Sequence, residues 1–215
     1  MTSARTITPL DRLLIRLDEA LRLSVGAAPA AARPNPAAGM EEAELGAEER
    51  RHVAGLMRVN HAGEICAQAL YAGQAATARQ DKVRIAMQQA ADEEIDHLSW
   101  CETRLRQLDN HTSLLNPLWY AGSFAIGAMA GLAGDSWSLG FVRETENQVE
   151  AHLQEHLERL PQEDTRSRAI LDQMKADEAR HAHMAESAGG RELPQVIRSA
   201  MALTSGIMKT LAYRI

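Results

Sequence analysis

Aromatic residues, prolines and thiols are scarce in this chain of 215 residues. It has only 2 Phe, 3 Tyr and 3 Trp, whereas Ala, Leu, Glu, Gln, Met and Arg are abundant, and this composition favours helix over sheet. After residue 41 the only prolines are Pro117, Pro161 and Pro194, and each falls where a helical pattern ends or restarts. The sequence therefore predicts an all-α protein.

The two cysteines and the charge balance exclude further classes. Cys66 and Cys101 form neither a Cys-x-x-Cys motif nor a secreted disulfide framework, which indicates a reducing compartment. The net charge of −6 and the lack of a basic stripe argue against nucleic-acid binding. Charged residues among the leucines of residues 1–25 interrupt any signal-peptide core. We expect these residues to form an amphipathic helix; the alternative is a targeting peptide.

The rest of the chain divides into a linker and one helical domain. Residues 26–39 are rich in Ala, Pro and Gly and predict a flexible linker that buries no core. The domain then occupies residues 40–215. Its expected long helices cover 47–78, 81–108, 136–160 and 163–188, and a C-terminal helix covers 194–213.

Each of the four long helices carries a carboxylate on an otherwise apolar stripe. Glu64 precedes Glu94 by 30 positions and Glu146 precedes Glu178 by 32. The second Glu of each pair begins a Glu-x-x-His motif, whose two side chains share one helix face. Burying an ionised carboxylate is costly without a partner, so we expect positive charge there. The domain therefore has the pattern of a duplicated helical hairpin.

Two helices giving one Glu each and two giving Glu-x-x-His each is the pattern of ferritin-like di-iron and di-manganese bundles. Four carboxylates balance two divalent cations, and oxygen and imidazole ligands suit iron or manganese. The candidate metal ligands are Glu64, Glu94, His97, Glu146, Glu178 and His181.

Chance alone gives about 0.7 Glu-x-x-His pairs in a chain of this composition, so one pair is weak support. The third pair, Glu49 and His52, lies in a charged helix start, and we interpret it as a decoy. Asp177 and Glu93 directly precede candidate ligands, and carboxylates so placed often accept the free ring N–H of a ligand histidine on a facing helix. For Asp177 this role and that of an ordinary solvated acid both stay open, whereas for Glu93 the solvated acid is favoured. The remaining histidines, expected to be surface or core residues, are His61, His111, His152, His156 and His183.

Residues 117–134 carry no formal charge, and their length only just qualifies as a membrane span. A spanning segment here would put the two hairpins on opposite sides of the bilayer, and the six ligands could not converge. We therefore expect a crossover helix between the hairpins. The apolar surplus, with a C-terminal helix that has no acid after Glu192, predicts a face resting on a membrane. The alternative is a face buried in an oligomer.

The sequence resembles the demethoxyubiquinone hydroxylases, di-iron monooxygenases of the ferritin-like superfamily. The resemblance covers about residue 51 to the C-terminus. Its most specific part is RVNHAGE at 58–64, followed by YAGQ at 71–74. Further matches are EIDHL at 94–98, Glu146, and DEARH at 177–181.

The resemblance implies that the six candidate ligands hold two iron ions per chain, with Glu94 and Glu178 bridging. It also implies O2-dependent hydroxylation of a polyprenylated methoxy-methyl-benzoquinol by a peripheral protein on the cytoplasmic side of a bacterial inner membrane. A homo-oligomer or a complex with other ubiquinone-biosynthesis proteins stays open. The alternatives are a ferroxidase or iron-storage protein, which favours a charged outer surface, and a structural membrane-associated bundle, which needs none of the six ligands.

Overall fold

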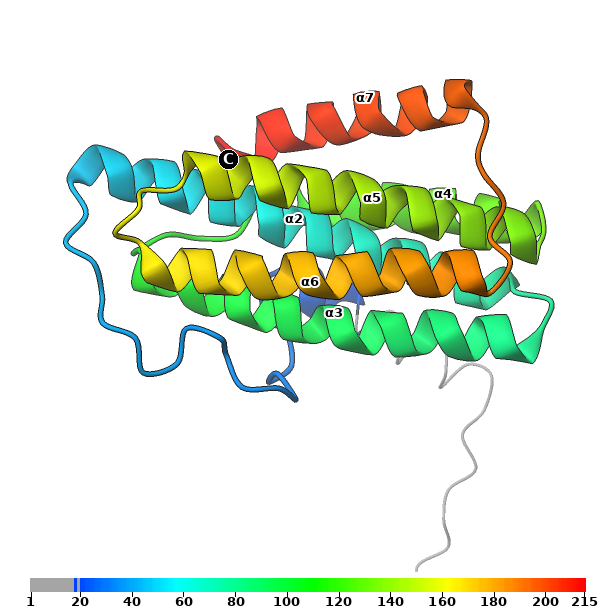
Figure 1. The fold of residues 1–215 in the computed structure, drawn as a ribbon, viewed down its shortest axis with the longest axis horizontal. Helices are drawn as coiled ribbons and strands as arrows, with labels where there is room; N and C mark the ends of the chain where they lie inside the picture. The colour runs from blue at the N-terminus through cyan, green and yellow to red at the C-terminus, as the bar shows by residue number, and fades with distance from the viewer. Residues whose placement is uncertain (1–17, 19) are drawn as a thin grey trace, which may run out of the picture.

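Four long helices run side by side along the longest axis of the molecule (Figure 1). The computed structural model describes residue 18 and residues 20–215. Its labelled helices are α2 (Ala47–Thr77), α3 (Asp81–Gln107), α4 (Asn116–Leu132), α5 (Asp135–Arg159), α6 (Thr165–Ser187) and α7 (Gln195–Ala212). The described residues contain no strand, so the all-α prediction is confirmed. Most of the expected N-terminal helix, residues 1–25, lies outside the described residues. Within the described part of that range, residues 20–24 are helical.

Two helical hairpins, α2–α3 and α5–α6, form the bundle, and α4 connects them. Helix α4 packs along α2, while α7 lies outside the bundle beside α5 and α2 (Figure 1). The backbones of α2 and α4 approach closely at Gly73 and Gly127, where an added Cβ would lie less than 3.0 Å from the facing backbone. Glycine at these two positions allows the crossover helix to dock against the bundle.

Local signals in the sequence explain where the helices begin. Asp164 precedes α6 and its Oδ1 accepts a hydrogen bond of 3.0 Å from the backbone N–H of Ser167, as an N-cap does. Pro117 stands in the first turn of α4, where its missing N–H costs nothing. Gly134, with a φ of 118°, forms the turn between α4 and α5. Both ends of each predicted helix from residue 47 onward lie within two residues of the observed bounds.

The bundle core consists of two apolar clusters separated by a polar layer. The first cluster includes Leu56, Trp100, Leu153 and Leu171, and the second includes Tyr71, Met87, Val142 and Ala185. On every long helix the candidate metal ligands fall between residues of these two clusters. The fold therefore places all candidate ligands at one height in the bundle.

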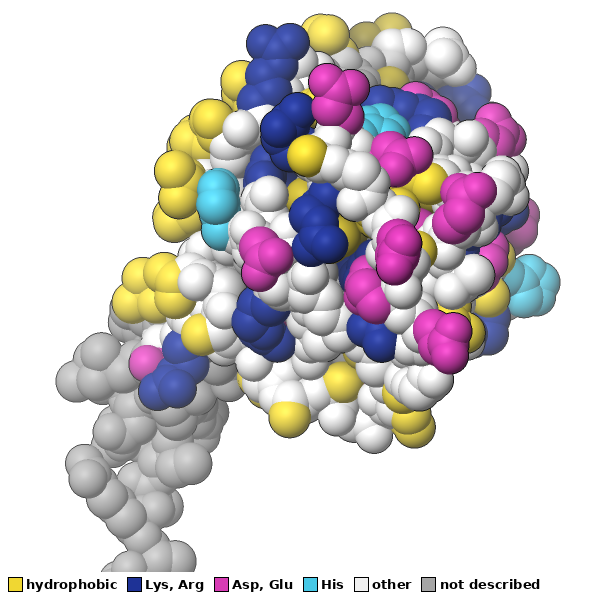
Figure 2. All heavy atoms as spheres, turned by 90° about the vertical axis from the view of Figure 1, so that its left-hand side faces the viewer, with side chains coloured by type: hydrophobic (Ala, Val, Ile, Leu, Met, Phe, Trp, Pro, Cys, Tyr) yellow, Lys and Arg dark blue, Asp and Glu magenta, His cyan; other side chains and the backbone are white. Residues whose placement is uncertain are grey.

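Exposed apolar side chains gather on α4 and α7. Figure 2 shows hydrophobic side chains along one edge of the molecule, and acidic and basic side chains interspersed over the rest of that view. The exposed residues include Leu118, Phe124, Met129 and Leu132 of α4, and Leu203, Ile207 and Leu211 of α7. Trp119 of α4 and Met208 of α7 pack in the same small cluster against α2. Among the described helices, none has the length and hydropathy that a membrane crossing requires.

Residues 26–39 form no helix or strand, but they pack against the bundle. Ala37 is buried within the first core cluster. The backbone N–H of Ala32 and the guanidinium of Arg33 donate hydrogen bonds to Asp96 of α3. The interpretation of this segment as a flexible linker that buries no core does not account for these contacts.

Candidate metal centre

The structure brings all six candidate ligands together in the polar layer. Every one of them is at most 4% exposed. They form two groups, in which one ligand atom from each residue lies within 4.8 Å of the others. The first group is Glu64, Glu94, His97 and Glu178, and the second is Glu146, Glu178 and His181. Glu178 belongs to both groups, so the two sites adjoin.

Glu94 and Glu178 both face the two histidines. Glu94 directs Oε2 to His97 Nδ1 at 3.0 Å and Oε1 to His181 Nδ1 at 3.3 Å. Glu178 directs Oε1 to His97 Nδ1 at 3.3 Å and Oε2 to His181 Nδ1 at 3.3 Å. Each carboxylate therefore presents one oxygen to either site, which is the arrangement that a bridging ligand requires.

The outer nitrogen of each histidine meets an acid from the opposite hairpin. His97 Nε2 lies 3.0 Å from Asp177 Oδ2, and His181 Nε2 lies 3.0 Å from Glu93 Oε2. Because a carboxylate accepts hydrogen bonds, each Nε2 carries the proton and donates it. Nδ1 then faces the glutamates as the nitrogen available to a metal. The sequence left this role open for Asp177 and favoured a solvated acid for Glu93, so the contact of Glu93 with His181 differs from the favoured interpretation.

The pKa values of the cluster reflect four carboxylates crowded with two imidazoles. Burial lowers the pKa of His181, but hydrogen bonds to Glu178 and Glu94 outweigh it and raise the pKa to about 12. Burial and the charge of Glu94 raise the pKa of Glu64 well above its usual range. Burial and the charge of Glu178 do the same for the pKa of Glu146. The crowded carboxylates therefore favour positive charge at the centre of the cluster.

Glu146 Oε2 is buried without a hydrogen-bond partner among the described residues, and Glu94 Oε1 and Glu178 Oε1 each face an imidazole Nδ1 at 3.3 Å without a well-aligned hydrogen bond. Buried carboxylate oxygens with so few partners are costly, and a cation would satisfy them. The donors are carboxylate oxygens and imidazole nitrogens, with no thiolate in either group. This donor set fits iron or manganese better than a metal that prefers sulfur.

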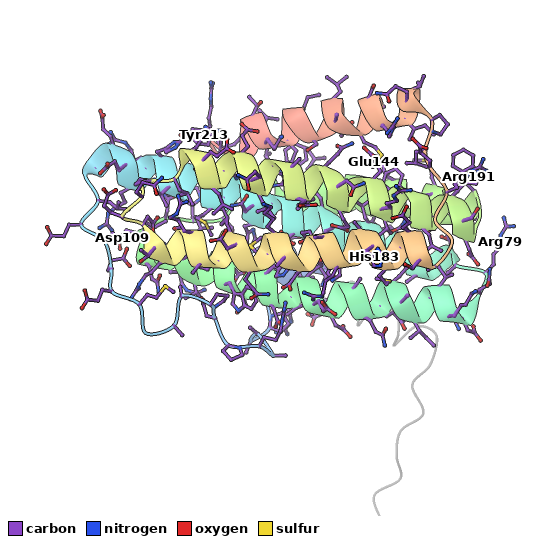
Figure 3. The ribbon with its side chains drawn as sticks, in the orientation of Figure 1. Arg79, Asp109, Glu144, His183, Arg191 and Tyr213 are labelled. Carbon is purple, nitrogen blue, oxygen red and sulfur yellow. The ribbon has the colours of Figure 1, made fainter. Side chains whose placement is uncertain are left out.

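The other histidines lie outside the two groups. His61, His152 and His156 are buried elsewhere in the bundle. His111 and His183 are exposed, and His183 lies on the face of α6 that is turned to the viewer in Figure 3. None of these five therefore joins the candidate ligands.

The pair interpreted as a decoy also lies apart from the centre. His52 Nδ1 lies 2.7 Å from the hydroxyl of Tyr213, which Figure 3 labels near the C-terminus. Glu49 accepts a hydrogen bond of 2.9 Å from the backbone N–H of Gly46, at the start of α2. Both residues therefore contact the ends of helices, His52 at the end of α7 and Glu49 at the start of α2.

Three functional contacts were not predicted from the sequence. Tyr71 donates a hydrogen bond to Glu146 and thereby orients that carboxylate. Asp96 and Asp177 both bind the guanidinium of Arg33. Tyr71 lies on the same stripe as Glu64, two turns further along α2, and this spacing was the available signal. Nothing in the linker-like composition around Arg33 indicated its partners.

Comparison with protein families identifies the chain. Residues 51–212 match the family model described as ubiquinone biosynthesis protein COQ7, and this range includes all six candidate ligands. This chain belongs to the COQ7 family. The family prediction made from the motifs at 58–64, 94–98 and 177–181 is therefore confirmed.

Curated relatives cover this COQ7-family chain from end to end. A 3-demethoxyubiquinol 3-hydroxylase of Xanthomonas euvesicatoria pv. vesicatoria (strain 85-10) is 60% identical over 100% of this chain and 99% of its own length. One from Xanthomonas campestris pv. campestris (strain 8004) is 62% identical over 98% of this chain and 97% of its own. One from Ectopseudomonas mendocina (strain ymp) is 54% identical over the full length of both.

Proposed function

We propose that this COQ7-family chain is a di-iron monooxygenase that hydroxylates the ring of a polyprenylated methoxy-methyl-benzoquinol in ubiquinone biosynthesis. The observation that carries the proposal is the pair of adjoining carboxylate and histidine groups in a chain 60% identical to a 3-demethoxyubiquinol 3-hydroxylase. When bound, two ferrous ions would supply the two electrons that, with two protons, let one oxygen atom of O2 enter the quinol ring and the other leave as water.

The residues of the chain divide the work of holding the two ions. Glu64 and His97 would hold one iron and Glu146 and His181 the other, and Glu94 and Glu178, whose oxygens face both histidines, would be shared between them. Asp177 and Glu93 accept hydrogen bonds from Nε2 of the two histidines and thereby hold the proton on that nitrogen, which leaves both Nδ1 atoms for iron. The apolar clusters above and below the layer exclude bulk water.

We further propose that the chain binds the cytoplasmic side of a bacterial inner membrane through α4 and α7. Helix α4 has no charged residue, and α7 has Arg198 and Lys209 but no acid. Exposed apolar side chains with basic residues nearby suit an anionic lipid surface. An isoprenoid tail does not dissolve in water, so this position brings the substrate and the enzyme together.

Metal analysis tests the centre. Purified protein should hold about two irons per chain, and Glu178→Gln should lose both because Glu178 belongs to both groups. Glu186→Gln is the matched control, because Glu186 is an exposed acid of the same helix and its ion pair is with Arg143. Iron content that is near zero in the wild type, or normal in Glu178→Gln, refutes the metal centre.

Product analysis tests the reaction. The iron-loaded protein, given a reductant, O2 and a demethoxy quinol, should yield a product heavier by one oxygen atom in mass spectrometry, and ¹⁸O2 should label it. Consumption of O2 without a hydroxylated product would refute the monooxygenase and favour a ferroxidase.

Vesicle binding tests the membrane face. Leu203→Glu and Ile207→Glu place acids at exposed positions of α7 and should weaken binding to anionic vesicles. Ile85→Glu makes the same change at an exposed position of α3 and should leave binding unchanged. Equal binding by all three variants and the wild type contradicts the membrane face.

A further inference from the structure

The two candidate metal sites have matching histidine partners but different surroundings. The acid that holds His97, Asp177, is completely buried, whereas the acid that holds His181, Glu93, has 43% of its side chain exposed. Asp177 also accepts hydrogen bonds from Gln173, Arg180 and Arg33. Among the described residues, the one arginine or lysine paired with Glu93 is Arg180. The ring of His97 is therefore held more firmly than that of His181.

Arg33 provides the contact that makes this difference, and it comes from the segment before α2. Its Nη1 donates to Asp177 Oδ2 at 2.7 Å, and its Nε donates to Asp96 Oδ2 at 2.6 Å. One planar guanidinium therefore joins α3 to α6 beside the centre. The guanidinium also lies 4.9 Å from the ring centroid of Trp100, which in turn packs against His97.

We propose that Arg33 is a positioning residue that fixes His97 through Asp177 and makes the site of Glu64 and His97 the tighter of the two metal sites. The proposal rests on the metal centre proposed above. Arg33 lies outside the residues matched by the family model, which begin at 51, so this is a contribution of the N-terminal segment to the centre.

Titration with Co²⁺, which reports its coordination by visible absorption, tests the proposal on the full chain. The wild type should bind two Co²⁺ in separable steps. Arg33→Ala leaves Asp177 in place but removes one of its partners, so it should weaken the tighter step about 10-fold, the low end of the range for loss of a ligand's own partner, and leave the weaker step unchanged. Arg33→Lys keeps the charge but not the planar fork, and it should recover part of the affinity.

Arg166→Ala is the matched control for loss of the segment's attachment. Arg166 holds the same N-terminal segment through Met40 O at 2.9 Å and Glu42 Oε2 at 3.0 Å. This variant should keep both Co²⁺ steps. If Arg33→Ala matches the wild type in both steps, or weakens both equally, the role of Arg33 is refuted while the metal centre stands. If the wild type binds no Co²⁺, both proposals fail.

Hydrogen exchange of the wild type gives a second test that needs no variant. The backbone N–H groups of Ala32 and Arg33 donate to Asp96 Oδ1, at 2.6 and 3.4 Å. The proposal couples the contacts of Arg33 to Co²⁺ binding at His97, because Asp177 binds both residues. Such coupling is reciprocal, so Co²⁺ binding should stabilise the contacts of Ala32 and Arg33 with Asp96. Exchange in the peptide covering 28–38 should slow on Co²⁺ loading. Unchanged exchange at saturating Co²⁺ contradicts the proposal.

Discussion

Replacing Gly127 of α4 with alanine should destabilise the protein, because the added Cβ meets the backbone of α2. That Cβ would lie 2.9 Å from Cα of Leu70 and closer still to its carbonyl oxygen. An ordinary contact needs 3.4 Å or more, and the carbonyl oxygen is the nearest atom, so α4 must move away from α2 by about 1 Å. Overpacking of this kind typically costs about 1–3 kcal/mol. At about 2–4 °C per kcal/mol for a chain of this size, the Tm should fall by about 2–12 °C.

Gly122 provides the matched control on the same helix. A Cβ at Gly122 meets nothing within 4 Å, so Gly122→Ala only improves helix propensity, by about 0.5–1 kcal/mol. Thermal unfolding followed by circular dichroism should therefore shift in opposite directions for the two variants. If Gly127→Ala is as stable as Gly122→Ala, the close crossing of α2 and α4 is refuted.

Three further predictions concern stability and reactivity. Burial lowers the pKa of His152 to about 4 and that of His156 to about 2, against about 6.5 when unfolded. The unfolded chain then binds protons that the folded one excludes, so stability present above pH 6.5 is lost as the pH falls, by about 2 kcal/mol per histidine at pH 5. Replacing both histidines with Gln should reduce the change in the denaturation midpoint between pH 7 and pH 5. A midpoint that changes with pH as much as in the wild type contradicts this. Arg104 is buried against Asp164 at 2.9 Å, so Arg104→Ala should cost about 3–5 kcal/mol in urea denaturation, and a loss below 1 kcal/mol would be inconsistent with the buried pair. Burial raises the pKa of Cys66 to about 11, so its alkylation by iodoacetamide at pH 8 should be far slower in the native than in the unfolded protein; equal rates would contradict this.

The helix pattern and the location of the centre could be predicted because both depend on local spacing. Glu94 and His97 share a face of α3 whatever surrounds them, and the apolar residues on that face show that it turns inward. The similar intervals from Glu64 to Glu94 and from Glu146 to Glu178 then place the candidate ligands of all four helices at one height in the bundle. The structure brings these residues together at that height.

The contacts of the N-terminal segment could not be predicted because they depend on tertiary position alone. Arg33 stands among alanines and prolines, and no periodicity links it to Asp96 or Asp177, which lie 63 and 144 positions away. Composition indicates that such a segment cannot form a core of its own. It does not indicate whether one side chain finds buried acids on a neighbouring surface.

The division of the centre between two hairpins has a consequence for the order in which the protein matures. The first hairpin supplies Glu64, Glu94 and His97, but Glu178 completes their group and is synthesised more than 80 residues after His97. In a ribosome-bound chain that ends before α6, Glu64, Glu94 and His97 therefore lack the fourth residue of their group. The group is complete only after the second hairpin has left the ribosome and docked on the first.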